Sequence, residues 1–122
     1  MHEIWLKYAE MDLESAQFLM GMIPKPIEII CYHCEQAAEK LLKGVLAYNN
    51  IDPPKTHDLV LLCNRCMEID NEFQKLINIC LELTPYATQI RYPSNIEVND
   101  NDANYAVKLC LEMNNFVTSK LL

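Results

Sequence analysis

A row of polar side chains follows helical spacing through the middle of the chain and carries residue types that bind phosphate. His33, Gln36, Lys40 and Lys43 are three or four residues apart, so a helix places all four on one side. Histidine transfers protons near neutral pH, and lysine ammonium groups neutralise phosphate charge. We therefore expect a candidate nucleotide or anion site along this row.

Two further groups of residues would complete such a site. Lys55 and His57 stand at the start of a predicted helix, whose first backbone N–H groups and dipole favour an anion. Arg91 and Tyr92 begin a polar loop, where the guanidinium offers a planar fork for phosphate and the ring offers a stacking surface. The candidate nucleotide- or anion-binding residues are Gln36, Lys40, Lys43, Lys55, His57, Arg91 and Tyr92.

The same residues also have a purely structural interpretation. Lys40 and Lys43 would then be ordinary solvated charges, with Lys43 pairing with Glu39 one helical turn earlier. His57 would cap or brace the corner between two helices, and Arg91 would bridge helices. Residue physics alone favours this structural interpretation, and no catalytic residue is assigned.

Apolar periodicity predicts about five helices that position these residues. The expected helices are 2–22, 26–48, a third from just after Thr56 to 69, a fourth that Asp70 caps, and a fifth starting between 100 and 103. We expect Thr56 to be the N-cap of the third helix, with Asp58 in its first turn, and Pro85 to kink or divide the fourth. The fold class is an all-α, antiparallel, up-and-down helical bundle, with residues 1–122 as one domain.

Composition sets further limits. A chain of 122 residues that is 51% hydrophobic and has two glycines favours a packed helical fold. A formal charge of −7 argues against general nucleic-acid binding, which depends on neutralising phosphates. No apolar run approaches the roughly 20 residues that span a bilayer. The acidic, amphipathic first residues do not resemble a signal peptide, so we expect a cytoplasmic protein.

The six cysteines raise the question of metal binding. Cys31-x-x-Cys34 and Cys63-x-x-Cys66 resemble the paired motifs of zinc sites, and the two pairs could meet across antiparallel helices. However, each pair lies inside a predicted helix, and the spacing between the pairs exceeds that of common zinc motifs. Reduced thiols packed in the core are the favoured interpretation. No glutamate has a histidine three residues later, so a di-iron bundle is not expected either, and we predict no metal or cofactor.

Two segments stand on either side of the predicted corner: QAAEKLLKGVLA at 36–47 and PPKTHDL at 53–59. Together with Ala9-x-x-Asp12-Leu13-x-x-Ala16 and Arg91-Tyr92-Pro93, they resemble the pattern of the HEPN domain family over essentially the whole chain. The resemblance implies a HEPN-like fold, a homodimer and a small nucleotidyltransferase as protein partner. Gln36, Lys40, His57 and Arg91-Tyr92-Pro93 fall on positions that belong to the family pattern.

Ribonuclease toxins of this family use an arginine and a histidine with four to six residues between them. This sequence departs from that motif, because no histidine follows His57. The corresponding positions after Arg65 hold Asp70, Asn71 and Glu72, and those after Arg91 hold Ile96, Glu97 and Val98. The motif that would carry RNA cleavage is missing, so the sequence does not predict a nuclease.

Three functions stay open. The first is a non-catalytic HEPN-type module that works as a homodimer beside a nucleotidyltransferase, in a toxin–antitoxin-like or nucleotide-related system, and contacts a nucleotide. The second is a divergent ribonuclease toxin that uses His57 and Arg91 in place of the missing motif. The third is a dimeric scaffold without a ligand. Binding measurements with nucleotides separate the first function from the third, and growth arrest on expression would identify the second.

Overall fold

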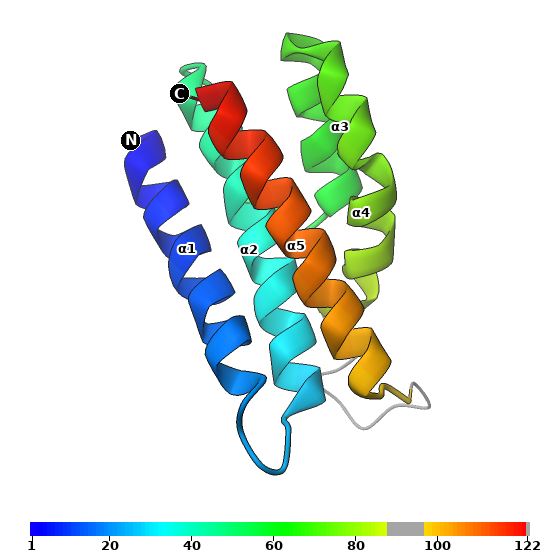
Figure 1. Ribbon diagram of the computed structural model, residues 1–122. Coiled ribbons are helices and arrows are strands. Elements are labelled where there is room, and N and C mark those ends of the chain that lie inside the picture. The colour runs from blue at the N-terminus through cyan, green and yellow to red at the C-terminus, as the bar shows by residue number, and fades with distance from the viewer. Residues whose placement is uncertain (88–96, 122) are drawn as a thin grey trace.

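All the regular structure in residues 1–87 and 97–121, the part that this computed structural model describes, is helical. The α-helices are α1 (His2–Leu19), α2 (Ile27–Tyr48), α3 (Leu59–Ile69), α4 (Ile77–Leu83) and α5 (Asp100–Leu121), and 3-10 helices at Asn71–Leu76 and Thr84–Ala87 flank α4. Figure 1 shows them packed as a bundle in which α1 and α2 run antiparallel. The sequence-based prediction of an all-α bundle of about five helices is confirmed.

Helix α1 ends earlier than the sequence predicts. It stops at Leu19, and residues 20–22 form a tight turn in which each N–H bonds to the carbonyl three residues before it. Gly21 is a poor helix former, and Pro24 and Pro26 prevent the helix from continuing. Pro26, predicted as the first residue of the next helix, takes the N-cap position of α2 instead.

Small residues let α1 and α2 approach closely. Ala9 and Ala16 are buried on α1, and α2 contributes Gly44 to the contact. A Cβ atom at position 44 would lie only 3.1 Å from Cδ2 of Leu6. Because α1 packs chiefly on α2, this contact fixes the outer helix of the bundle.

The connector between α2 and α3 corrects two predictions about the start of the third helix. Asn50 adopts a left-handed conformation, with φ 61°, directly after α2 ends, and Pro53 and Pro54 keep the next residues extended. The N-cap of α3 is Asp58, whose Oδ1 accepts from the N–H of Leu61 at 3.1 Å. The predictions of Thr56 as cap and of Asp58 in the first turn are therefore wrong. Thr56 instead accepts from the N–H of Asp58, at 3.1 Å, and holds the chain just before the helix.

The region after α3 corrects the predicted start of the fourth helix, because Asp70 precedes a 3-10 helix and α4 begins only at Ile77. The side chain of Asp70 accepts from the N–H of Glu72 at 3.0 Å and caps the 3-10 helix that leads into α4. Helix α4 ends at Leu83, and Pro85 lies in the following 3-10 helix, so the proline divides this segment. Helix α5 begins at Asp100, within the expected interval.

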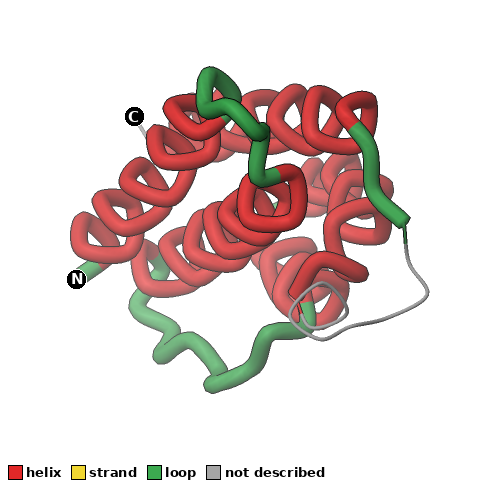
Figure 2. The backbone as a smooth tube through the Cα atoms, turned by 90° about the horizontal axis from the view of Figure 1, so that it is seen from below, coloured by secondary structure: helices red, strands yellow, loops and turns green. Residues whose placement is uncertain are grey.

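Helix α2 is the centre of the core. It packs against α1, α3 and α5. Figure 2 shows the helices in red, joined by the connecting segments in green. The fully buried side chains include Leu41, Leu42 and Leu46 on α2, together with Leu59 and Leu62 on α3. All six cysteines are buried as thiols in this core.

The described ends of the chain lie at the same end of the bundle, where α1 begins and α5 ends (Figure 1). None of the described helices is long and apolar enough to cross a membrane.

Candidate functional site

The first cluster of candidate residues joins α1 to α2 around Asp12. Nδ1 of His33 lies 2.9 Å from Oδ1 of Asp12, and Nζ of Lys40 donates a hydrogen bond to Oδ2 of the same carboxyl. The side chain of Asp12 is only 13% exposed, so both contacts lie in partly desolvated surroundings. One carboxylate of α1 therefore holds both a histidine and a lysine of α2.

The second cluster repeats this arrangement around Glu39. Nδ1 of His57 lies 2.8 Å from Oε1, and Nζ of Lys43 donates to Oε2 at 3.0 Å. Glu39 is 5% exposed and Lys43 is 8% exposed, and the ammonium group of Lys43 lies 5.5 Å from the centre of the Trp5 ring. The carboxylate therefore anchors the connector at His57 to the middle of α2.

In each cluster the carboxylate fixes which histidine nitrogen faces outward. A carboxylate beside an ammonium group is ionised and only accepts hydrogen bonds, so Nδ1 of His33 and of His57 must donate. Nε2 is then the nitrogen available to a ligand. His57 is 74% exposed, whereas His33 is 27% exposed, so His57 presents the more accessible ring.

The polar row on α2 is more enclosed than the structural interpretation of the sequence expected. Lys43 is buried and Lys40 is half-buried, so their description as solvated charges is wrong. The expected pairing of Lys43 with Glu39 is confirmed. Gln36 donates from Nε2 to Oε1 of the fully buried Glu35 at 2.7 Å. Gln36, Lys40 and Lys43 thus all contact carboxylates of this chain.

The remaining candidates lie at the corner and in the loop before α5. Lys55 is exposed and makes no ion pair within the described residues. The N-terminus of α3 is occupied by Asp58, which already accepts from one of its backbone N–H groups. Arg91 and Tyr92 lie outside the described residues, so their part in the candidate site stays a prediction.

Sequence reasoning did not assign Asp12, Trp5 and Glu35 to the candidate site. The signal for Asp12 was its place in α1, directly before the buried Leu13. An acidic side chain at the edge of a buried stripe needs a cationic partner, and α2 supplies two. The position of those partners depends on the register of α1 against α2, which local spacing does not reveal.

The cysteine pairs do not form a metal site in the described part of the chain. No three histidine, cysteine or acidic side chains there lie close enough together to hold a metal ion. Sγ of Cys66 donates to the carbonyl of Leu42, and Sγ of Cys63 donates to the carbonyl of Phe73. Burial raises the pKa of Cys31 and of Cys66 to about 12. These thiols behave as small core residues.

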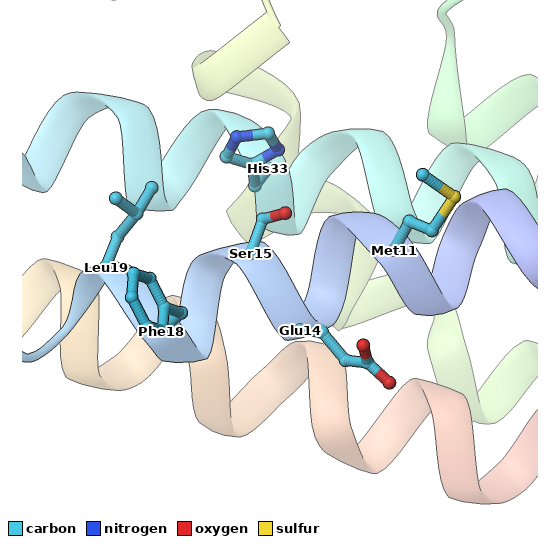
Figure 3. Close-up of a pocket in the computed structure, with 6 residues that line it drawn as sticks. All are labelled: Met11, Glu14, Ser15, Phe18, Leu19 and His33. Carbon is cyan, nitrogen blue, oxygen red and sulfur yellow. The ribbon is translucent and has the colours of Figure 1, made fainter.

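A shallow groove of about 510 Å³ lies beside His33, on the outer side of α1. Figure 3 shows Ser15 on α1 below the His33 ring, with Met11 and Phe18 on either side. Glu14 and Leu19 complete the lining. The groove is mainly apolar, and its one histidine is already held by Asp12.

Comparison with known protein families shows to which family this chain belongs. The sequence model of the HEPN domain matches residues 2–120. The chain belongs to the HEPN domain family. The structure is similar to the crystal structure of ST0689, described as an archaeal HEPN homologue, with a TM-score of 0.76 and 24% identity over 99% of this chain and 98% of that one.

This HEPN protein is also similar to TT1696 from Thermus thermophilus, with a TM-score of 0.86 and 24% identity over 98% of this chain and 97% of that one. At this level of identity, both likenesses establish the fold alone. No curated protein matches the sequence.

Proposed function

We propose that this HEPN protein is a non-catalytic binding module that works as a homodimer beside a small nucleotidyltransferase and contacts a nucleotide phosphate at the corner before α3. The observation that carries the nucleotide part is the placement of His57. Its ring is exposed, yet the buried Glu39 holds Nδ1 in a fixed position, and Lys55 precedes it closely in the connector. The nucleotidyltransferase partner follows from the family resemblance.

The corner suits a weak anion site better than the row on α2. A phosphate at Lys43 would have to displace a buried ion pair with Glu39, which costs several kcal/mol. At the corner, Nε2 of His57 and the ammonium group of Lys55 reach solvent without breaking a contact. Because the chain is acidic overall, these two groups would recognise one phosphate group and not an extended polyanion.

Calorimetric titration with ATP, GTP and inorganic triphosphate, each with and without magnesium, tests the nucleotide part. We expect saturable binding that Lys55→Ala or His57→Gln weakens by about tenfold, in line with the loss of one charge-assisted contact. Lys75→Ala is the matched control, because Lys75 is an exposed lysine whose ion pair in the described structure is with Glu72. No heat for any of these anions would leave a dimeric scaffold without a ligand.

One observation favours the divergent ribonuclease as second candidate. A carboxylate that holds Nδ1 and leaves Nε2 exposed is the arrangement that enzymes use for a general base, and His57 with Glu39 has it. Incubating purified protein with single-stranded RNA decides between the two. Cleavage that His57→Gln abolishes and Lys75→Ala leaves unchanged would replace the binding proposal; intact RNA would support it.

A further inference from the structure

The outer side of α1 carries a continuous apolar seam. We define the seam as Ile4, Tyr8, Met11, Ser15 and Phe18 on α1, continued by Met22 in the turn after it. These positions alternate in steps of four and three residues, the seven-residue repeat of helices that pack along their length. The large side chains of the seam are between 48% and 84% exposed.

From this we propose that the seam is the contact between two copies of this chain, with two α1 helices packed antiparallel about a two-fold axis at the level of Leu13. The inference rests on the homodimer of the proposed function and names the face that forms it. In this register Ile4 lies opposite Met22, Tyr8 opposite Phe18, and Met11 opposite Ser15 of the second copy. A two-fold contact requires that one surface complement itself, and every seam position here has a seam position opposite it.

The groove beside His33 supplies the matching hole. Met11, Glu14, Ser15 and Phe18 are four of the residues that line it, and they have the spacing of the four residues that surround a knob in helix packing. In the proposed register, the side chain that enters this hole is Met11 of the second copy. Ser15 is the small residue that leaves the room (Figure 3).

Composition and area favour a second copy as the occupant. None of the seam positions is charged, and Glu14, which lines the hole, is exposed and can keep its carboxylate in solvent. The exposed seam side chains, with Ile23 directly after Met22 in the chain, offer several hundred Å², on the order of the ~800 Å² that each partner gives to a standard interface.

Sedimentation equilibrium tests the face. We expect the wild type to be dimeric and Phe18→Asp to raise the dimer dissociation constant by at least about 100-fold, since Phe18 lies in the seam with 84% of its surface exposed. Leu81→Asp is the matched control, because Leu81 is 56% exposed on α4, away from the seam. Circular dichroism establishes that each variant is folded, and Tyr8→Asp repeats the test at a second position.

Disulfide trapping tests the register. Mixing Met11→Cys protein with Ser15→Cys protein under mild oxidation should give a cross-linked dimer, because the register places these positions opposite each other. Mixing Ile4→Cys with Ser15→Cys should not, and the six native thiols are buried.

The outcomes separate this inference from the proposed function. A dimer that Phe18→Asp and Tyr8→Asp leave intact would overturn the seam while keeping the homodimer. A monomeric wild type would overturn both. A seam variant that stays dimeric but loses binding to a nucleotidyltransferase would assign the face to that protein instead.

Discussion

Nδ1 of His57 lies 2.8 Å from Oε1 of Glu39, and the same carboxyl holds Nζ of Lys43 on its other oxygen. An exposed residue of the connector is thereby attached to a buried charge in the centre of α2. Asp12 joins His33 and Lys40 in the same way. The two carboxylates therefore fix α1 and the connector to the same helix.

Removing one member of the buried pair should destabilise the fold strongly. Lys43→Met leaves Glu39 buried without its ammonium partner, and we expect the free energy of unfolding to fall by about 3–5 kcal/mol. Urea denaturation followed by circular dichroism measures the change.

The control removes both charges together. Glu39→Met with Lys43→Met leaves no buried charge at this pair, so most of the lost stability should return, although His57 loses its anchor. If Lys43→Met alone lowered the free energy of unfolding by less than about 0.5 kcal/mol, as a surface substitution does, the assignment of this pair as buried would be contradicted.

The cap of α3 gives a second prediction. Asp58→Ala removes the acceptor for the N–H of Leu61 and should cost about 1 kcal/mol, measured by urea denaturation. Thr56→Ala removes a contact outside the helix and should cost less. A larger loss of stability in Thr56→Ala than in Asp58→Ala would indicate that Thr56 is the cap.

That pair of residues shows where sequence reasoning stops. Threonine and aspartate are both preferred N-cap residues, so the pattern Thr56-His57-Asp58 does not say which of them ends the extended connector. The Lys43–Glu39 pair was predictable because one helical turn separates the residues. The burial of that pair was not, because it depends on the way Trp5 of α1 packs beside Lys43.

The same limit applies to the candidate site as a whole. Helical spacing correctly gathered His33, Gln36, Lys40 and Lys43 on α2, and apolar periodicity located the helices. The carboxylates that engage them come partly from another helix, and Asp12 meets His33 only through tertiary packing. The assembly of a site depends on such packing, so phosphate binding at these residues stays a prediction.

A third prediction concerns the close contact of α1 and α2. Gly44→Leu should destabilise the protein by about 1–3 kcal/mol, because even a Cβ atom at this position would lie 3.1 Å from Leu6. Gly44→Ala should stay within about 1 kcal/mol of the wild type, since the gain in helix propensity offsets the tight contact. Combining Gly44→Leu with Leu6→Ala should recover part of the loss in thermal unfolding. No recovery would mean that another neighbour limits the space.

A fourth prediction concerns the thiols. Burial raises the pKa of Cys31 and of Cys66 to about 12, so at pH 8 only roughly one molecule in ten thousand carries either thiolate. Iodoacetamide should leave Cys31 and Cys66 unmodified in the folded protein and label all six cysteines in urea, as peptide mass spectrometry would report. Fast labelling of the folded protein would instead reveal local opening of the core.

A fifth prediction concerns acid and the end of α5. Hydrogen bonds from Lys120 lower the pKa of the Asp70 and Glu72 carboxyls below their usual values. Their contribution to stability is therefore present above the unfolded pKa of about 4, and is lost as the pH falls through the lowered folded values. Lys120→Gln should lower the melting temperature by about 1–3 °C at pH 7, and the difference should shrink below about pH 3.

Lys108→Gln is the control for this experiment. Lys108 is an exposed lysine of α5 that makes no ion pair in the described part of the chain. Its variant should show the same melting temperature as the wild type at every pH. A pH-independent loss in Lys120→Gln would indicate that the contact of Lys120 with the Phe116 ring matters more than the carboxyls.

The described chain ends lie at one end of the bundle, and this has a consequence for tagging the protein (Figure 1). A fluorescent label at either end of a single chain would sit at that same end. In the antiparallel dimer that we propose, the two-fold axis sends the labels of the two copies to opposite ends, separated along α1 by roughly 30 Å. Energy transfer between such labels would therefore report assembly and relative orientation in one measurement.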